Sequence, residues 1–387
     1  MVGSEIRYST LGFHLLAKPA GAMCNLACKY CFFLSKEKLY PNSTFRMSDE
    51  LLDLYIRRLI ESQPPSQVNI VWQGGEPTLM GIDFFRRAIE LQQKYKKPGM
   101  VIQNSMQTNG VLIDDEWGLF FSENDFLVGI SIDGPQKLHN QFRVDKRGKP
   151  THEKVMKGLG YLKKYNVQFN VLATVNAANE KYPAKVYRFL KNQACAQFVQ
   201  FIPIVEYKKL NGRILVSDGS VQPRQYGKFM SDIFDEWAQH DVGKIYVQMF
   251  DAALANRIGA PPGVCIFAPV CGVSPVLEHN GDVYACDHFV DPEYLLGNIN
   301  NSPLQVLMNK NIMHTFGNAK LNTLPQYCQK CDVLFACHGG CPKDRFLKAP
   351  DGEPGLNYLC PGYKKFFNHI KQPMGIMAQQ LKNNLAQ

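Results

Sequence analysis

Six apolar segments of strand length alternate with amphipathic segments of helical length in the first half of this chain. The strand segments are residues 13–17, 68–72, 100–108, 126–132, 167–175 and 197–204, and the helical segments are 48–62, 83–95, 114–123, 152–165 and 181–193. Such alternation favours parallel strand pairing with right-handed crossovers. Six units predict an α/β fold built on an open, partial (β/α)6 TIM-like barrel, with its chemistry at the C-terminal ends of the strands.

The composition changes after the barrel. Eight of the twelve cysteines fall between residues 265 and 360, together with many Gly and Pro residues and few long apolar runs. A segment of this composition buries little core by itself, so bound metal is expected to stabilise it. We predict three parts: a barrel over 1–235, a small cysteine-rich iron–sulfur domain over 236–361 and a C-terminal helix over 362–387.

Several classes of protein are disfavoured by the sequence. No run of eighteen apolar residues is present, so no membrane span is expected, and MVGSEIRYST at the N-terminus lacks the apolar core of a signal peptide. The formal charge of +9 is scattered rather than massed, which argues against a nucleic-acid partner. We therefore expect a cytoplasmic protein whose cysteines bind metal rather than form disulfides. Cys195, alone on a predicted helix, is expected to be a small buried hydrophobe.

Three cysteines follow the first strand in the sequence AGAMCNLACKYCFF. Cys24, Cys28 and Cys31 have C-x3-C-x2-C spacing, which puts three thiolates on one short loop. A 4Fe–4S cluster usually takes four cysteine ligands, so three would leave one iron open for another molecule. On spacing alone, a zinc site or three structural thiols also fit.

A second motif, WQGGEPTL, follows the second strand. Gly74 and Gly75 permit a close approach of the backbone to a ligand. Glu76 can accept a hydrogen bond from an ammonium group. Taken alone, the motif also fits a plain Gly-Pro turn.

The cysteine loop, with Tyr30 directly before its last cysteine, resembles the signature of the radical S-adenosylmethionine enzymes. The resemblance implies that the open iron chelates S-adenosylmethionine and that Gly74, Gly75 and Glu76 hold the amino group of the cofactor. It further implies that Ser131 contacts the ribose and that Arg143 binds the cofactor carboxylate, for which a guanidinium fork is suited. Val205, after the last strand, would contact the adenine through its backbone.

The eight late cysteines are enough for two sites of four ligands each, either two clusters or two structural zinc ions. The spacing C-x2-C-x5-C-x3-C in CQKCDVLFACHGGC resembles the twin-cluster SPASM domain of certain peptide-modifying radical enzymes. That resemblance implies three 4Fe–4S clusters in all. It assigns Cys265, Cys271, Cys286 and Cys341 to an inner auxiliary cluster, and Cys328, Cys331, Cys337 and Cys360 to an outer one.

Two fully ligated auxiliary clusters argue for oxidation of the substrate, because a substrate radical that loses an electron needs an acceptor nearby. Oxidation of CH2–SH or CH2–OH to an aldehyde also needs a base. Asp287 directly follows Cys286, and we predict that it lies beside the inner cluster and acts as this base. An ordinary turn-capping aspartate is the alternative.

Over nearly its full length the chain resembles the anaerobic sulfatase-maturating enzymes. This implies oxidation of a Cys or Ser in a sulfatase polypeptide to Cα-formylglycine by a monomer that receives electrons from a reduced flavodoxin- or ferredoxin-type donor. One alternative is another SPASM-type enzyme that forms thioether or carbon–carbon crosslinks. We expect the barrel to begin near residue 10 without a leader-recognition domain before it, and this argues against that alternative. A zinc-stapled binding protein and a nucleic-acid modifier are further alternatives.

Overall fold

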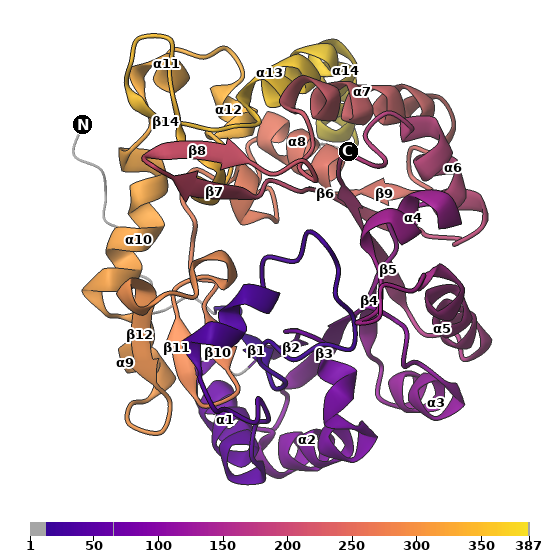
Figure 1. Cartoon of the computed structure of the whole chain (residues 1–387), viewed down its shortest axis with the longest axis vertical. Coiled ribbons are helices and arrows are strands. Elements are labelled where there is room, and N and C mark those ends of the chain that lie inside the picture. The colour runs from indigo at the N-terminus through magenta and orange to yellow at the C-terminus, as the bar shows by residue number, and fades with distance from the viewer. Residues whose placement is uncertain (1–12, 65, 386–387) are drawn as a thin grey trace.

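The computed structural model of the protein describes residues 13–64 and 66–385. Six parallel strands alternate with helices and curve into an open barrel (Figure 1), which confirms the predicted fold class. The strands are β1 (Leu16–Lys18), β2 (Gln67–Trp72), β3 (Val101–Thr108), β4 (Leu127–Ser131), β5 (Phe169–Val175) and β6 (Phe198–Pro203). The predicted start of the barrel near residue 10 lies outside the described residues.

The barrel helices form where the apolar periodicity predicts them. These are α1 (Asp49–Ser62), α2 (Ile82–Tyr95), α3 (Asp115–Glu123), α5 (His152–Lys164) and α6 (Pro183–Asn192). The short helix α4 (Gln136–Phe142) was not predicted, and α7 (Pro223–His240) comes after the last barrel strand. Ser48 caps α1 by accepting a hydrogen bond from the N–H of Leu51 at 3.2 Å. Asp114 caps α3 in the same way, with the N–H of Trp117 at 3.1 Å. Each cap satisfies a backbone donor that the first turn of a helix leaves unpaired.

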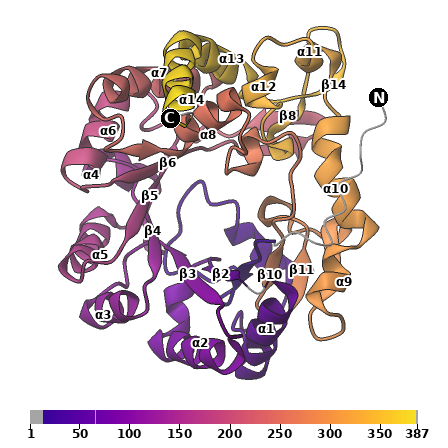
Figure 2. The ribbon, with the colours of Figure 1, turned by 180° about the vertical axis from the view of Figure 1, so that it is seen from behind.

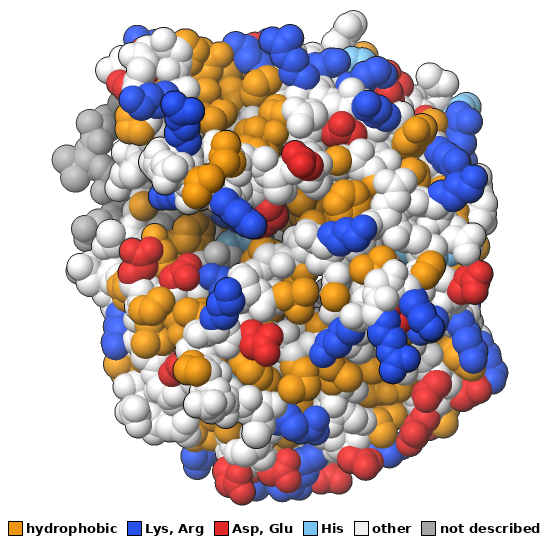
Figure 3. All heavy atoms as spheres, in the orientation of Figure 1, with side chains coloured by type: hydrophobic (Ala, Val, Ile, Leu, Met, Phe, Trp, Pro, Cys, Tyr) orange, Lys and Arg blue, Asp and Glu red, His pale blue; other side chains and the backbone are white. Residues whose placement is uncertain are grey.

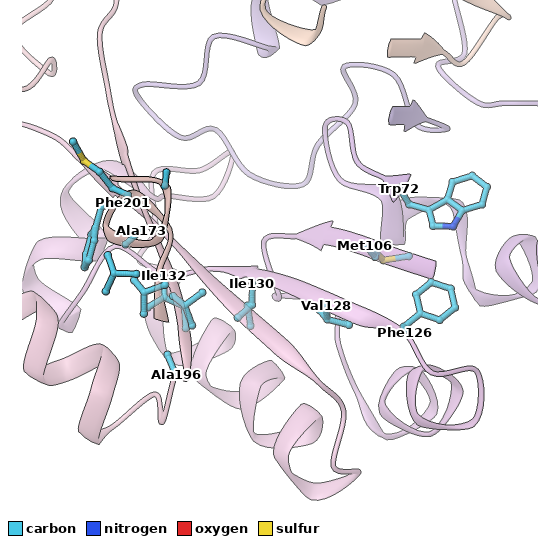
Figure 4. Packing of buried hydrophobic residues seen from close by; sticks show 14 of the residues in the cluster. Trp72, Met106, Phe126, Val128, Ile130, Ile132, Ala173, Ala196 and Phe201 are labelled. Carbon is cyan, nitrogen blue, oxygen red and sulfur yellow. The ribbon is translucent and has the colours of Figure 1, made fainter. Parts of the chain in front are cut away.

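A continuous apolar core fills the space between the strands and these helices. Trp72 on β2, Met106 on β3 and Val128 on β4 are almost fully buried and come from neighbouring strands (Figure 4). Burial of one such side chain stabilises the fold by about 1.5–3 kcal/mol. This core stabilises the sheet, and the segments that follow the strand ends remain available for binding and catalysis.

The register of the barrel strands brings their C-terminal ends to one rim. Trp72 at the end of β2 lies opposite Met106 of β3, and Thr108 at the end of β3 lies opposite Ile130 of β4. Ser131, which ends β4, pairs with Leu172 of β5. Because all these pairs are parallel, the segments that follow the strands meet at the same edge of the sheet.

The cysteine-rich segment adds strands to this same sheet. The order is β12-β11-β10-β1-β2-β3-β4-β5-β6-β9, with β9 (Tyr246–Val247), β10 (Val276–Glu278), β11 (Asp282–Tyr284) and β12 (Leu295–Asn298) as the added strands. Strand β10 runs parallel to β1, with Lys18 opposite Glu278. These strands are two to four residues long, so apolar alternation does not reveal them. The hairpin turn in HNGDVYACDHF (279–289), which presents Cys286, was predicted, and β10 and β11 flank that turn.

Helices from the second half of the chain gather beside β6 and β9, where α7, α8, α13 and α14 lie together (Figures 1 and 2). The remaining helices are α8 (Gln248–Ile258), α9 (Leu304–Met308), α10 (Asn311–Asn322), α11 (Gln326–Gln329), α12 (Leu334–Cys337), α13 (Cys360–His369) and α14 (Lys371–Leu385). Two further ribbons are β7 (Tyr207–Leu210) with β8 (Arg213–Val216), and β13 (Leu347–Lys348) with β14 (Pro354–Leu356).

The predicted division at residues 235 and 361 stays a prediction, because α7 runs across the first boundary and α13 across the second. Among residues 13–64 and 66–385, no helix is long and apolar enough to cross a membrane.

Candidate active site

The three-cysteine loop follows β1 directly. The N–H of Cys31 donates to the carbonyl of Cys28 at 3.0 Å, and the N–H of Leu26 donates to Sγ of Cys24 at 3.4 Å. Burial, with a smaller contribution from charge on the neighbouring thiols, raises the pKa of Cys24 to about 12 and that of Cys28 to about 11. Three half-buried thiols therefore share a small space. Bound metal would displace their protons, as thiolate ligation requires.

The glycine motif holds this loop in place. The N–H of Gly75 donates to the carbonyl of Gly21 at 2.8 Å, and the N–H of Glu76 donates to the carbonyl of Met23 at 2.9 Å. A Cβ on Gly75 would lie 2.0 Å from the carbonyl oxygen of Met23. The close approach that requires glycine at position 75 is thus to the backbone before Cys24, whereas the sequence predicted an approach to a ligand.

The carboxylate of Glu76 joins the ends of β2 and β3. It accepts hydrogen bonds from the N–H and hydroxyl of Thr78 at 3.1 and 2.7 Å, the hydroxyl of Thr108 at 2.8 Å and the N–H of Asn109 at 2.8 Å. Burial raises the pKa of Glu76, and these four donors oppose the rise. Both carboxylate oxygens are engaged by the protein, so Glu76 shapes the rim in addition to the predicted role toward an ammonium group.

Tyr30, Asp133 and Arg143 form a buried cluster beside the cysteine loop. The hydroxyl of Tyr30 donates to Asp133 at 2.5 Å, and Nε of Arg143 lies 3.1 Å from the other oxygen of that carboxylate. The guanidinium also lies over the ring of Tyr30, at 5.5 Å from its centre. Burial alone would raise the pKa of Asp133, but Arg143 and the other neighbours hold it below its usual range. The carboxylate therefore orients both predicted cofactor residues.

The other predicted cofactor residues lie along the same rim. Ser131 ends β4 and accepts a hydrogen bond from Nε2 of Gln107 at 3.1 Å. Val205 is buried just after β6. Asn109, to which sequence reasoning assigned no role, donates to Oδ1 of Asn25 at 2.7 Å and lies 3.7 Å from Sγ of Cys24. The sequence feature that could have identified Asn109 is the segment TNG directly after a strand. Its contacts with Asn25 and Cys24, however, depend on how the loops fold.

Asp287 forms a buried ion pair with Lys18, the last residue of β1. The ammonium of Lys18 also lies 3.3 Å from the ring centre of Phe33. Burial alone would raise the pKa of Asp287, but Lys18, and after it His288, hold that pKa below its ordinary value. The sequence analysis did not single out Lys18. Its only distinguishing feature in the sequence is that a charged residue directly follows an apolar segment. The structure thus joins Asp287 to the barrel rim through a side chain of β1.

The eight late cysteines fall into two groups around two hollows. Cys265, Cys271, Cys286 and Cys341 line one hollow, together with His288 and Phe316. A second hollow is lined by Cys328, Cys331, Cys337 and Cys360. We call these the inner and outer thiol sets. They are the same two sets of four that the resemblance implied, and four thiols match the usual ligand set of an iron–sulfur cluster.

In the described part of the chain, no three His, Cys, Asp or Glu side chains converge on one metal-ion position.

Near the inner thiol set, Lys343 pairs with Glu206 at 2.7 Å, which ties the segment after Cys341 to the segment after β6. Figure 3 shows the surface hollowed below the β7–β8 ribbon on this side of the molecule.

The prediction for Cys195 was wrong. Helix α6 ends at Asn192, and Cys195 lies exposed in the turn that follows. Its φ of 57° is left-handed, a conformation that no helix interior contains. Its Sγ lies 3.8 Å from the carbonyl oxygens of Asn192 and Gln193, so it contacts the helix end rather than the core.

Comparison with known proteins agrees with this geometry. The radical SAM superfamily matches residues 19–190, and the iron–sulfur cluster-binding SPASM domain matches residues 270–332. A serine-type anaerobic sulfatase-maturating enzyme of Bacteroides thetaiotaomicron is 48% identical over 386 residues, covering 96% of this chain and 93% of the relative. A cysteine-type anaerobic sulfatase-maturating enzyme of Clostridium perfringens is 36% identical over 376 residues, covering 95% and 99%.

Solved structures give the same result. Native anSMEcpe with bound AdoMet superposes with a TM-score of 0.85 at 35% identity, over 95% of this chain and 99% of that one. The same enzyme with bound AdoMet and Kp18Cys peptide gives a TM-score of 0.86 at 34% identity, over the same shares. Streptococcus suis SuiB bound to S-adenosylmethionine shares only the fold, with a TM-score of 0.62 at 14% identity over 91% of this chain and 75% of that one.

The open barrel, the three-cysteine rim and the two thiol sets define a radical SAM enzyme that carries an iron–sulfur SPASM domain. Within that class, the chain belongs to the family of anaerobic sulfatase-maturating enzymes.

Proposed function

We propose that this chain oxidises the CH2–SH or CH2–OH side chain of a Cys or Ser in a sulfatase polypeptide to the aldehyde of Cα-formylglycine. Three 4Fe–4S clusters and S-adenosylmethionine are its cofactors in this proposal. When bound, S-adenosylmethionine supplies the radical that removes a hydrogen atom from carbon, and the auxiliary clusters supply an electron acceptor. The observation that carries the proposal is the buried ion pair of Asp287 with Lys18 of the barrel rim, at the residue directly after Cys286 of the inner thiol set.

The remaining roles, binding of the clusters and of S-adenosylmethionine, fall to separate groups of residues. Cys24, Cys28 and Cys31 would hold the cluster at the rim, and one iron would stay open because the loop provides three thiols. Around it, Tyr30, Gly74, Gly75, Glu76, Ser131, Arg143 and Val205 would bind and orient S-adenosylmethionine. The inner and outer thiol sets would hold the two auxiliary clusters.

Asp287 takes the proton that the substrate sulfur or oxygen loses as the carbon becomes an aldehyde or thioaldehyde; water then converts a thioaldehyde to the aldehyde and releases hydrogen sulfide. A carboxylate can act only while it is ionised, and Lys18 favours that form. Phe33 covers the ammonium from one side and so limits the access of water to the pair. The ion pair thus keeps a base ready beside the inner thiol set.

The proposed reaction also sets requirements for the compartment and for the electron donor of the enzyme. Thiol-ligated clusters persist in a reducing compartment, so we place the reaction in the cytoplasm. A reduced flavodoxin- or ferredoxin-type protein would supply the electron for cofactor cleavage, and the enzyme would act as a monomer.

The test is reconstitution without oxygen, followed by reductant, S-adenosylmethionine and a peptide that contains Cys-x-Pro-x-Arg or its Ser counterpart. We expect a mass loss of about 18 units for the thiol peptide and about 2 for the hydroxyl peptide, with 5′-deoxyadenosine formed alongside. Asp287→Asn should lower aldehyde formation far more than cofactor cleavage. Asp291→Asn is the control, because Asp291 pairs with Lys36 at a more exposed position. Zinc in place of iron, or an equal fall of both products in Asp287→Asn, would contradict the proposal.

A further inference from the structure

A fully buried lysine lies next to the inner thiol set. Lys320 is on α10, and its exposed fraction is 0%. Its ammonium donates to the carbonyl oxygens of Cys265, Ile266 and Ala268 at 2.5, 2.9 and 2.6 Å. All three donors of the ammonium are satisfied by one short segment that begins with a cysteine of the inner set. A charge of this kind is costly to bury unless something of opposite sign lies nearby.

Helix α10 holds a second cysteine of the same set. The N–H of Cys271 donates to the carbonyl of Gly317, one turn before Lys320, at 3.1 Å. Phe316 of the same helix lines the inner hollow. Burial lowers the pKa of Lys320 to about 8, and the charges of Cys271, Cys265 and Cys341 oppose that fall. The ammonium thus lies within electrostatic reach of three of the four inner thiols.

A guanidinium extends this arrangement toward the outer thiol set. Arg345 donates to the carbonyl of Lys320 at 2.6 Å, and to those of Gly339 and His338 at 2.9 and 2.8 Å. The segment His338–Gly340 joins Cys337 of the outer set to Cys341 of the inner set. Its three residues have φ of 45°, 72° and 63°, so the backbone wraps around the guanidinium. A Cβ on Gly339 would lie 2.5 Å from Nη2 of Arg345, which leaves room only for glycine.

Thiols of both sets act on Arg345. Cys328 and Cys337 of the outer set, and Cys271 and Cys341 of the inner set, raise its pKa against the lowering effect of burial. The two cations therefore differ in position: Lys320 adjoins the inner set, whereas Arg345 lies between the sets. A cluster with four thiolate ligands is an anion, and its reduction potential depends on the charges and hydrogen bonds around it.

We propose that Lys320 and Arg345 are buried counter-charges that raise the reduction potentials of the auxiliary clusters, Lys320 that of the inner cluster and Arg345 those of both. This inference rests on the proposed function in one respect, namely that the two thiol sets hold iron–sulfur clusters. Adding an electron to an anionic cluster is favoured by a nearby fixed cation, and more so in a medium of low dielectric constant. The inner cluster is thereby made a better acceptor for the electron that leaves the substrate. Both residues act through the clusters, so they are positioning residues and not catalytic ones.

The experiment uses the full chain with Cys24, Cys28 and Cys31 replaced by alanine, so that only auxiliary clusters contribute to the spectra. Iron content is measured first, and the midpoint potentials are then measured by redox titration followed by electron paramagnetic resonance. Lys320→Gln keeps an amide donor for the carbonyls but removes the charge, and Lys320→Arg keeps the charge. Lys310→Met, which removes an exposed charge just before the same helix, is the matched control.

We expect Lys320→Gln to shift the inner potential downward and to leave the outer potential almost unchanged. Arg345→Gln should lower both, and Lys320→Arg should restore the inner potential toward that of the parent. If Lys320→Gln loses the inner cluster while Lys320→Arg keeps it, a requirement for the positive charge is also supported, because both variants keep N–H donors and only the arginine keeps the charge.

Unchanged potentials in a fully loaded Lys320→Gln protein would overturn the inference. Loss of the inner cluster in both Lys320→Gln and Lys320→Arg would also overturn it, because the site would then depend on the shape of lysine rather than on its charge. Failure of the proposed function is distinct, since the parent protein would then bind no iron at either thiol set.

Discussion

The ammonium of Lys18 and the carboxylate of Asp287 form an ion pair although the two residues are 269 positions apart in the chain. Lys18 ends the first strand of the barrel, and Asp287 follows the second strand of the hairpin that extends the same sheet. The side chain of Lys18 is 2% exposed and that of Asp287 is 22% exposed, so water screens the pair only weakly. One interaction thus connects the barrel with the segment that carries the proposed base.

Lys18→Met is expected to uncouple aldehyde formation from cofactor cleavage. Without the cation, burial raises the pKa of Asp287 and its carboxylate is no longer held in place. We expect aldehyde formed per 5′-deoxyadenosine to fall at least about tenfold, within the range that general bases contribute. Mass spectrometry and chromatography of the same reaction measure both products. Lys36→Met, which removes a more exposed ion pair with Asp291, should keep the parent ratio. An unchanged ratio in Lys18→Met would show that Asp287 does not depend on its partner.

Gly75→Ala is expected to remove the rim cluster and to spare the auxiliary ones. The added Cβ would overlap the backbone of Met23, which cannot move without displacing Cys24. Iron per chain should fall by about a third if three clusters of equal iron content are bound. Gly160→Ala is the control, since a Cβ there meets no atom within 4 Å on helix α5. Full iron content in Gly75→Ala would contradict the assigned role of the glycine.

Tyr30→Phe is expected to destabilise the fold by about 1.5–3 kcal/mol, the usual contribution of a hydrogen bond to a charged group. The change removes the hydroxyl that donates to Asp133 at 2.5 Å and leaves one oxygen of a fully buried carboxylate without that donor. Urea unfolding under anoxia gives the free energy of unfolding. Tyr182→Phe serves as a comparison, because Tyr182 is 49% exposed. A loss of the same size in both variants would rule out a special role for the Tyr30 hydroxyl.

Asp241 should stabilise the protein at neutral pH and lose this effect in acid. It accepts hydrogen bonds from Nζ of Lys191 at 2.6 Å and from the hydroxyl of Tyr187 at 2.7 Å. Burial would raise its pKa, but the hydrogen bonds from Lys191 and Tyr187 outweigh burial, so the pKa is lower in the folded protein than in the unfolded chain. The stabilisation is therefore present above the ordinary aspartate pKa of about 3.9 and is lost as the pH falls below it.

The check for Asp241 is a comparison of parent and Asp241→Asn by urea unfolding. The difference in free energy of unfolding should be constant from about pH 7 to 5 and should shrink below about pH 4. Asp232→Asn, which removes a more exposed pair with Lys228, should give a small difference at every pH. A difference for Asp241→Asn that grew toward acid would contradict the assigned sign.

The long elements of the barrel could be predicted from the sequence because each carries a clear pattern. The helix at 48–62 has a capping serine and a regular apolar face, and it is α1 within one residue. The hairpin turn between the three-residue strands β10 and β11 was predicted from HNGDVYACDHF, but the pairing of β10 with β1 depends on tertiary contacts. The end of α6 was predicted within one residue, but Cys195 lies beyond it in a left-handed conformation that exposes the thiol and that no sequence pattern indicated.

The site was predictable in its ligands and less so in its contacts. Counting the late cysteines indicated two sites of four ligands, and the resemblance to the SPASM domain divided them into the two sets that line the two hollows. The partners of those residues were not predictable, because Lys18, Asn109 and Lys320 act through atoms that only folding brings together. Linear order limits which residue types are available, whereas the packing of loops determines which of them touch.

Strand β1 has neighbours on both sides, β2 from the barrel and β10 from the cysteine-rich segment. A truncation that stops before residue 276 would strip one edge of β1 of its partner and expose its backbone groups to other chains. The cysteine-rich half is therefore not a separate unit that can be removed or exchanged between relatives at a linker, and we expect a working chimera to take β1 and β10 from the same parent.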